Sequence, residues 1–224
     1  MYKYVKRTVD VVCAAVGIII TSPIWLFAIV GIFISDPGPV FYTSQRIGKD
    51  NKLFKMYKFR SMRSAKGVNE SSLRADSNRI FPFGTLIRAL KIDELPQLWN
   101  ILNGTMSVIG PRPVANDQKD LFRTGRWNKA ALVPVGLSGP AALYDFIYGD
   151  YFTDEEEYME KVFPTRRELE ITYVDKIGPL YDAKMILYTL ISIVYRVFGK
   201  NPNWMLNEFI RDAEISLNDV HKNI

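Results

Sequence analysis

The stretch Lys91-Ile92-Asp93-Glu94-Leu95-Pro96-Gln97-Leu98-Trp99-Asn100-Ile101-Leu102-Asn103-Gly104 predicts a short helix that begins with two adjacent carboxylates. Apolar residues at helical spacing give this helix one hydrophobic face, formed by Leu95, Leu98, Trp99 and Leu102. Pro96 is tolerated in a first turn, and Gly104 suits the end of a helix. We therefore place Asp93 at the N-cap.

The two carboxylates have two interpretations. The positive end of the helix would stabilise the ionised form of Asp93 and favour a phosphate nearby, which predicts a binding or catalytic site. The simpler interpretation is that Asp93 only caps the helix and that Glu94 is an ordinary first-turn residue. An isolated Asp-Glu pair favours the simpler interpretation, so the rest of the chain decides.

Cysteine and histidine are almost absent from the chain. Its 224 residues, enough for one domain with a sizeable core, include only Cys13, in an apolar run, and His221, near the C-terminus. This usage excludes a disulfide framework and a cysteine metal site. Catalytic groups must then be carboxylates, hydroxyls, Lys or Tyr, and a bound metal must prefer oxygen ligands.

Positive charge is concentrated near the N-terminus. Residues 1–66 contain 11 Lys and Arg against 3 acidic residues, whereas residues 67–224 contain 18 against 21. A basic region beside a hydrophobic segment indicates an anionic membrane surface in preference to nucleic acid.

An uncharged run of 24 residues extends over 11–34, with Ser22-Pro23 at its middle. One helix of this length would be about 36 Å long, enough to cross a bilayer core of about 30 Å. Basic residues flank the run on both sides, and the positive-inside bias places both flanks in the cytoplasm. We therefore predict a re-entrant helix–break–helix over residues 1–35, with the break at Pro23 and the hydroxyl of Ser22 satisfying a freed carbonyl. A kinked transmembrane helix is the alternative, and the run is too long for a cleavable signal peptide.

Two short strands are expected after this segment, at Val40-Phe41-Tyr42 and over residues 53–62. The second alternates apolar and basic residues, and it contains Lys58 and Arg60 on one face. Basic and aromatic residues in alternation are also typical of single-stranded nucleic-acid platforms. The membrane segment instead favours lipid headgroups or a diphosphate as the ligand. Residues 64–79, which end at Arg79, are polar and aperiodic and predict a mobile loop.

The segment Met106-Ser107-Val108-Ile109-Gly110-Pro111-Arg112-Pro113 predicts a short strand that enters a rigid turn. Prolines on both sides of Arg112 fix the backbone, as suits a guanidinium that binds phosphate through two hydrogen bonds. For this tetrapeptide alone, an exposed arginine in a proline turn is the simpler interpretation.

Several stretches of residues 3–113 occur together in one family and in the same order. They are Lys6-Arg7 with Asp10, Ser22-Pro23, Asp36-Pro37-Gly38-Pro39-Val40-Phe41, Gln45-Arg46-Ile47-Gly48, Lys58-Phe59-Arg60-Ser61-Met62, Asp93-Glu94-Leu95-Pro96-Gln97-Leu98-Trp99-Asn100 and the segment that ends in Gly110-Pro111-Arg112-Pro113. On these motifs the chain resembles the bacterial sugar transferases, and among them the small monotopic polyprenyl-phosphate phosphoglycosyl transferases. The resemblance weakens after Val114: family members often carry Pro-Gly-Ile-Thr-Gly followed by a Gln, but here Val135-Gly136-Leu137-Ser138-Gly139 has no such Gln. This departure bears on the donor sugar more than on the chemistry.

The resemblance implies a reaction in two steps. The carboxylate of Asp93 would attack a nucleoside diphosphate sugar, with uridine as the suggested nucleoside, to give a phosphosugar–enzyme intermediate and a nucleoside monophosphate. Polyprenyl phosphate would then accept the phosphosugar, in the first membrane step of surface glycan assembly. The resemblance also implies that Asp93 and Glu94 hold Mg²⁺, with Mn²⁺ able to substitute. A divalent cation and arginines would offset the repulsion between a carboxylate and a diphosphate.

The expected catalytic residues are thus Asp93 and Glu94. The side chains expected to bind substrate are Lys58, Arg60, Arg79, Arg88, Gln97 and Arg112. The expected partners are the two substrates, inner-leaflet lipids and downstream glycosyltransferases, but not nucleic acid. The expected location is the cytoplasmic face of the bacterial inner membrane.

The fold class is predicted to be α+β and rich in helix, with three parts. These are the membrane segment over residues 1–35, a cytoplasmic catalytic domain over residues 36–200 and a C-terminal amphipathic helix over residues 201–224. Residues 150–171 predict an acidic, mostly solvated helical excursion, and the apolar run 185–195 predicts a helix on the membrane or in the core. The apolar face of the C-terminal helix could bind the membrane, the domain or a partner.

Two other classes of function stay open. One is a membrane scaffold with the same fold and no catalysis, which the presence of Asp93, Glu94 and Arg112 disfavours. The other is a metal-dependent phosphodiesterase or phosphatase that uses the same carboxylates with water.

Overall fold

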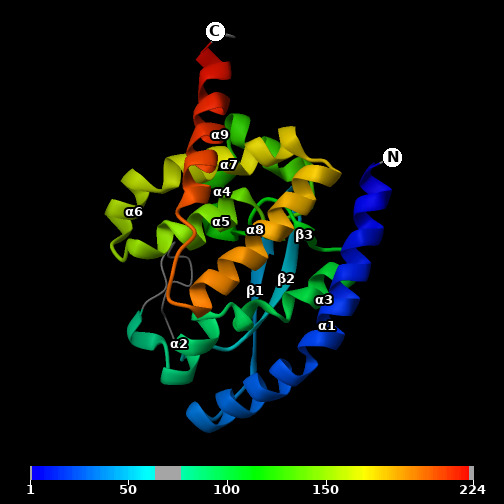
Figure 1. Ribbon diagram of the computed structural model, residues 1–224, viewed down its shortest axis with the longest axis vertical. Coiled ribbons are helices and arrows are strands. Elements are labelled where there is room, and N and C mark those ends of the chain that lie inside the picture. Colours follow the sequence, from blue (N-terminus) through cyan, green and yellow to red (C-terminus); the bar gives the residue numbers. More distant parts are fainter. Residues whose placement is uncertain (1, 64–76, 222–224) are drawn as a thin grey trace.

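The computed structural model describes residues 2–63 and 77–221, with side chains as far as residue 216. It confirms a helix-rich α+β fold with small sheets (Figure 1). The principal elements are α1 (Tyr2–Ser35), β1 (Phe41–Ile47), β2 (Leu53–Phe59), α2 (Pro82–Ala89), η3 (Ile92–Glu94), α3 (Gln97–Leu102), β3 (Ser107–Ile109), β4 (Val114–Ala115), α4 (Lys119–Phe122), η5 (Gly125–Leu132), β5 (Gly136–Ser138), α5 (Pro140–Ile147), α6 (Glu155–Lys161), α7 (Phe163–Lys176), α8 (Pro179–Val197) and α9 (Trp204–His221). Most of the expected loop over residues 64–79 lies outside the described residues, and its end, Ser77–Arg79, forms the short 3₁₀ turn η2.

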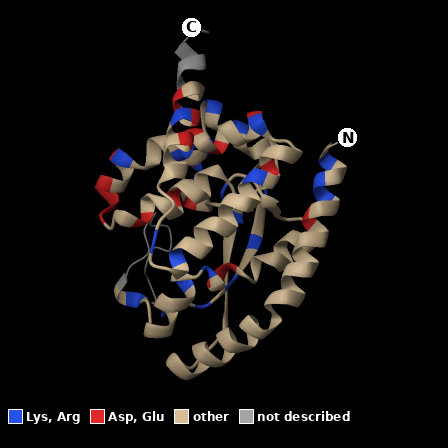
Figure 2. Cartoon of the chain, viewed as in Figure 1, with Lys and Arg blue, Asp and Glu red and all other residues tan. Residues whose placement is uncertain are grey.

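Helix α1 contains the whole uncharged run and keeps Pro23 inside it. Figure 1 shows that the helix bends as it passes beneath the sheets, and Figure 2 shows that its charged residues lie only towards its N-terminal end. The expected break is therefore a bend in one continuous helix. Ser22 Oγ donates at 2.8 Å to the carbonyl of Ile19, which is the carbonyl that Pro23 leaves without its helical N–H partner. Entry into and return from one leaflet stay a prediction.

Only a narrow stripe of α1 packs on the domain. Ala28 and Ile32 are fully buried, and a Cβ on Gly31 would lie 2.2 Å from the ring of Phe83, so glycine is required for this close approach. The opposite face is apolar and exposed over most of the length of the helix, for example at Ile19, which is 72% exposed. In the part of the chain that the structure describes, α1 is the one helix long and apolar enough to cross a membrane. Such a face is typical of a membrane contact.

The expected strands form an antiparallel hairpin. Strand β1 pairs with β2 along its full length, from Phe41 opposite Phe59 to Ile47 opposite Leu53, and β4 adds to the other edge of β1. Full pairing extends β1 well beyond the three residues expected from sequence. Strands β3 and β5 form a separate parallel pair.

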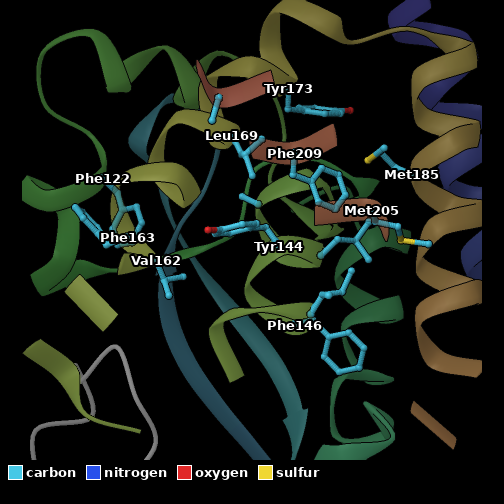
Figure 3. Packing of buried hydrophobic residues seen from close by; sticks show 14 of the residues in the cluster. Phe122, Tyr144, Phe146, Val162, Phe163, Leu169, Tyr173, Met185, Met205 and Phe209 are labelled. Carbon is cyan, nitrogen blue, oxygen red and sulfur yellow. The ribbon is translucent and has the colours of Figure 1, made fainter. Parts of the chain in front are cut away.

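The main hydrophobic core lies among α5, α7, α8 and α9 (Figure 3). Met205 and Phe209 of α9 are fully buried in it, so the C-terminal helix packs on the domain itself. The acidic excursion is only partly solvated, in contrast to the expectation. Glu155 and Glu156 are exposed, whereas Glu168 on α7 is buried because it faces basic side chains.

Candidate active site

The two carboxylates lie in η3, a 3₁₀ turn that precedes α3. Lys91 enters this turn in the left-handed conformation, with φ of 57°. The N–H groups of Glu94 and Leu95 already donate to carbonyls three residues earlier, and the N-cap residue of α3 is Pro96. The expectation that Asp93 caps an α-helix, and is stabilised by its free N–H groups, is therefore wrong. Successive turn hydrogen bonds consume those groups.

Helix α3 is held against β2 by one buried amide. Asn100 Nδ2 donates to the carbonyl of Lys55 at 2.7 Å, and Asn100 Oδ1 accepts from the N–H of Tyr57 at 3.0 Å. These bonds turn Asn100 and Ile101 inward. Trp99 of the expected apolar face is consequently 56% exposed. Arg7 of α1 also donates to the carbonyls at the end of α3, so α1 and β2 together hold the helix that follows the dyad.

Glu94 is an ionised carboxylate in a cationic setting. Lys58 Nζ lies 3.1 Å from Glu94 Oε1, and Lys91 Nζ lies 3.9 Å from the same oxygen. Burial by itself would raise the pKa of Glu94, but the positive charges of Lys58, Lys91 and Arg112 outweigh it and hold the pKa well below its ordinary value. Glu94 is therefore a weak base and a persistent anion.

Asp93, the neighbouring residue, has a pKa that is shifted in the opposite direction. It is 4% exposed, and its Oδ1 has no hydrogen-bond partner among the described residues. Burial raises the pKa of Asp93 and the negative charge of Glu94 adds to this, while Lys58 opposes both. An unsatisfied buried carboxylate oxygen is costly to the fold, and Glu170 Oε1 and Asp212 Oδ2 are unsatisfied as well, so the place of Asp93 next to the pocket-lining Glu94 is what supports a functional role.

A pocket of about 130 Å³ opens beside the dyad. Four of the expected site residues line it, namely Lys58, Glu94, Gln97 and Arg112. The other lining residues are Arg46, Met56, Pro113, Gln118, Gly136, Leu137, Asp145 and Arg166. Asp93 is not among the lining residues, but Glu94, which follows it directly, and Gln97 are. The pocket therefore joins cationic side chains to the turn that carries both carboxylates.

Arg112 is held at the pocket by its own backbone. Its N–H donates to Glu170 Oε2 of α7 at 2.7 Å, and its carbonyl accepts from Arg123 Nη2 at 3.3 Å. The two flanking prolines have no N–H, so the Arg112 amide is the donor by which α7 can hold this turn. The expected rigid presentation of a guanidinium at a site is thereby explained.

Three expected substrate-binding arginines lie outside this pocket. Arg60 is buried and pairs with Asp36, Arg79 donates to the carbonyl of Arg63, and Arg88 Nη1 lies 3.5 Å from the hydroxyl of Ser61. The positive charge of Arg88 still lowers the pKa of Asp93. Arg60 thus closes the turn after α1, because its guanidinium is committed to Asp36 and the carbonyl of Pro39.

The pocket lining also contains residues that sequence analysis did not single out. Asp145 comes from α5 and Arg166 from α7, both beyond the part of the chain where the family motifs are clear. Arg166 lies in a segment whose acidic composition predicted a solvated surface. Its direct neighbour Arg167 gave no contrast in sequence, so only packing distinguishes the two.

The donor set of the dyad is compatible with a divalent cation only if substrate phosphates and water complete its coordination. No group of three or more acidic, histidine or cysteine side chains is placed to hold a metal ion within the described ranges 2–63 and 77–216. The unsatisfied Oδ1 of Asp93 and the carboxylate of Glu94 nevertheless supply two hard oxygen ligands on adjacent residues. Mg²⁺ commonly binds through one or two carboxylates and completes its coordination with water and substrate phosphates.

Comparison with known proteins gives a consistent set of relatives. The chain is 32% identical to a UDP-N-acetylgalactosamine-undecaprenyl-phosphate N-acetylgalactosaminephosphotransferase of Aeromonas hydrophila, over 87% of this chain and 44% of the relative. It is 32% identical to a UDP-glucose:undecaprenyl-phosphate glucose-1-phosphate transferase of Escherichia coli, over 84% of this chain and 40% of the relative. An uncharacterized sugar transferase of Bacillus subtilis, EpsL, is 33% identical over 84% of this chain and 87% of its own length.

The chain thus spans less than half of the length of the first two relatives. The family described as bacterial sugar transferase matches residues 1–196, which include α1, the dyad, Arg112 and both walls of the pocket. Because this match covers most of its length, the chain belongs to the bacterial sugar transferase family.

Proposed function

We propose that this chain transfers a sugar 1-phosphate from a uridine diphosphate sugar to polyprenyl phosphate. The products are a polyprenyl-diphosphate sugar and uridine monophosphate. The names of the relatives support both substrates, since they describe transfer from UDP-sugars to undecaprenyl phosphate. The observation that carries the proposal is the buried, unsatisfied carboxylate of Asp93 beside a cation-lined pocket.

Asp93 is the proposed nucleophile. One oxygen of its carboxylate forms a bond to the phosphorus that carries the sugar, and the bond from that phosphorus to the bridging oxygen breaks, so the nucleoside monophosphate leaves with the electron pair. An oxygen of polyprenyl phosphate then bonds to the same phosphorus and the Asp93 carboxylate leaves. The orphaned Oδ1 supports this role, because no hydrogen bond among the described residues has to be broken before attack.

Glu94, Lys58 and Arg112 surround the reacting phosphate in this proposal. The low proton affinity of Glu94 suits it to bind cations in place of accepting a proton. Lys58 and Arg112 offset the negative charge of the diphosphate, which a carboxylate nucleophile would otherwise repel. A Mg²⁺ ion held by Asp93 and Glu94 would add Lewis-acid stabilisation of the phosphate oxygens.

The test is to locate the covalent intermediate. The protein is incubated with a labelled UDP-sugar without polyprenyl phosphate, and the modified peptide is sequenced by mass spectrometry. We expect phosphosugar on Asp93 in the wild type, none in Asp93→Asn, and slow accumulation in Glu94→Gln. An adduct on Glu94, or turnover by Asp93→Asn, would contradict the assignment. Continued release of uridine monophosphate without polyprenyl phosphate, beyond the one equivalent that accompanies formation of the adduct, would instead indicate a phosphodiesterase, and absence of any release a scaffold.

We place the protein on the cytoplasmic face of the bacterial inner membrane, with α1 as its monotopic anchor. Support comes from the exposed apolar face of α1 and the basic residues on both flanks. Single cysteines replace Lys3 and Lys49 in a Cys13→Ser background, because Cys13 is exposed and would react itself. We expect an impermeant thiol reagent to label neither position in intact cells. A position that reacts from outside would show a transmembrane helix, and Pro23→Leu should shift α1 towards that state.

A further inference from the structure

Part of the pocket lining has no role in the proposed chemistry. This part includes Gly136 and Leu137 of β5, Asp145 of α5 and Arg166 of α7. Of these, Asp145 is the unexpected residue, because it places a carboxylate in a pocket whose other charged lining is mostly cationic. Its side chain is 14% exposed, so it is largely buried and still reaches the pocket.

The contacts of Asp145 leave part of its carboxylate available. Tyr158 donates its hydroxyl hydrogen to Asp145 Oδ1 at 2.8 Å. Asp145 Oδ2 lies 3.7 Å from Arg166 Nη1, which is longer than a hydrogen bond, and Arg166 Nη1 instead donates to the hydroxyl of Tyr158. Among the described residues, no hydrogen bond to Oδ2 is present. One oxygen is thus fixed in place and the other keeps its acceptor capacity.

The carboxylate is also held in its charged form. Burial by itself would raise the pKa of Asp145, but the positive charges of Arg166, Arg112 and Lys91 and the hydrogen bond from Tyr158 outweigh it, so the pKa lies below its ordinary value. Arg112 and Lys91 also act on Glu94, so the two carboxylates share one set of cations across the pocket.

An ionised carboxylate does not suit every part of a nucleotide sugar. It repels the diphosphate, which the lysine and arginines of the pocket attract. It accepts hydrogen bonds from hydroxyl, amide or amine groups, which the sugar and the nucleoside carry and the diphosphate does not. An ionised acid in the lining of this pocket therefore points to the uncharged parts of the donor.

We propose that Asp145 accepts a hydrogen bond from a hydroxyl or N–H group of the bound nucleotide sugar, and that this contact selects the donor. The inference rests on the proposed function, because it assigns a role at the same pocket. A donor that lacks the matching group would leave a buried charged acceptor unpaired, which a polar site penalises far more than a missing apolar contact. Asp145 follows the segment Val135–Gly139, where this chain departs from the family pattern. We therefore expect the donor preference of this chain to differ from that of other family members.

The experiment compares the wild type with Asp145→Asn. For each, kcat and KM are measured with UDP-glucose, UDP-galactose and their N-acetylated 2-amino counterparts, together with inhibition by uridine monophosphate. We expect Asp145→Asn to lower kcat/KM for the best wild-type donor by about 10- to 100-fold and to reduce the discrimination between epimers. Unchanged inhibition by uridine monophosphate would support a contact with the sugar. Weakened inhibition with an equal loss for all donors would overturn the selection of the donor, because every donor carries the same uridine.

Two further variants make the result decisive. Glu168→Gln changes another buried carboxylate, on α7, that is not among the residues lining the pocket, and it should leave KM and donor preference unchanged. Tyr158→Phe keeps every charge and removes the bond that orients Asp145 Oδ1, together with the bond that Arg166 Nη1 donates to the Tyr158 hydroxyl. If Asp145→Asn does not fold, Tyr158→Phe should still raise KM for the preferred donor at unchanged kcat.

The inference and the proposed function can fail separately. An active wild type with the same KM values and donor ranking in Asp145→Asn would overturn the inference alone, as would an equal loss with all donors and a lower melting temperature. If the wild type releases no uridine monophosphate from any donor, the proposed function fails. In that case calorimetric titration measures the affinities of the wild type and of Asp145→Asn for the same UDP-sugars. Equal affinities, or no binding by either protein, would overturn the inference as well.

Discussion

Asp93 on η3 and Glu168 on α7 are both nearly fully buried carboxylates, at 4% and 2% exposed, and their surroundings differ in one respect. Both oxygens of Glu168 are used: Oε1 accepts from Trp127 Nε1 at 2.8 Å, and Oε2 pairs with Arg126. Oδ1 of Asp93 has no hydrogen-bond partner in the described part of the chain, although Lys58 is near enough to lower its pKa. Burial alone therefore does not distinguish a structural acid from a reactive one. An unused acceptor does not make the distinction by itself either, since Glu170 Oε1 and Asp212 Oδ2 are also unsatisfied; Asp93 combines an unused acceptor with its place next to the pocket-lining Glu94.

The largest effect expected at the dyad is that of a chelator. If the carboxylates of η3 act with Mg²⁺, EDTA should abolish turnover, Mg²⁺ or Mn²⁺ should restore it, and Zn²⁺ should substitute poorly because the ligands are hard oxygens. The melting temperature should hardly change, because the paired acids on α7 need no metal. Release of nucleoside monophosphate is the measurement. Full turnover in excess chelator would contradict the proposed role of Mg²⁺ at the carboxylates of η3.

Removing the cation that the two carboxylates share should have the next largest effect. Lys58 lowers the pKa of both Asp93 and Glu94, so Lys58→Gln should let both pKa values rise. Since attack needs an ionised carboxylate, the acidic limb of kcat/KM should move to higher pH, and the rate at neutral pH should fall by roughly 10- to 100-fold. Lys55→Gln is the matched control, because Lys55 is an exposed lysine on the same strand. An unmoved acidic limb in Lys58→Gln would argue against this electrostatic coupling.

Glu168→Gln should separate stability from activity on the α7 side. It removes the charge that pairs with Arg126 and weakens the bond from Trp127, so the free energy of unfolding should fall by about 1–3 kcal/mol. Turnover per folded molecule should be retained. Denaturant unfolding and a rate assay on the same sample provide both values. A loss of activity at unchanged stability would place Glu168 in the chemistry.

Asp93→Asn should have the reverse effect on the two measured quantities. Turnover should be lost, whereas the free energy of unfolding should rise by a smaller amount than Glu168→Gln lowers it. Because the folded-state pKa of Asp93 is raised, wild-type stability from the protonated form is present below the ordinary carboxyl pKa and is lost as pH rises through the raised value. At neutral pH the neutral asparagine should therefore raise the free energy of unfolding, by about 0.5–2 kcal/mol, while turnover is lost. The gain should disappear in acid. Unfolding curves across this pH range would test it, and a destabilised Asp93→Asn would make Asp93 a structural acid like Glu168.

Local sequence was sufficient for several features of this protein. The uncharged run and Ser22-Pro23 predicted an apolar helical segment and the serine bond to a freed carbonyl, although the expected break is only a bend, and the alternation over residues 53–62 predicted β2. Adjacent carboxylates with Arg112 and Lys58 identified one wall of the pocket. These features follow from spacing along the chain, since hydrophobic period, proline geometry and charge act over a few residues.

Other features depended on contacts between distant segments. The predicted N-cap position and stabilised ionised form of Asp93 were wrong. The 3₁₀ hydrogen bonds consume the N–H groups that a helix end would have offered, and burial raises the pKa of Asp93 where a helix dipole would lower it. The alternation of apolar and basic residues over 53–62 predicted that Arg60 binds a phosphate, but its guanidinium pairs with Asp36. Asp145 and Arg166 line the pocket only because α5 and α7 pack opposite η3. The burial and the pairing of a side chain depend on neighbours from distant parts of the chain, which the local sequence does not reveal. Tertiary structure alone therefore decides which charges are satisfied and which remain to react.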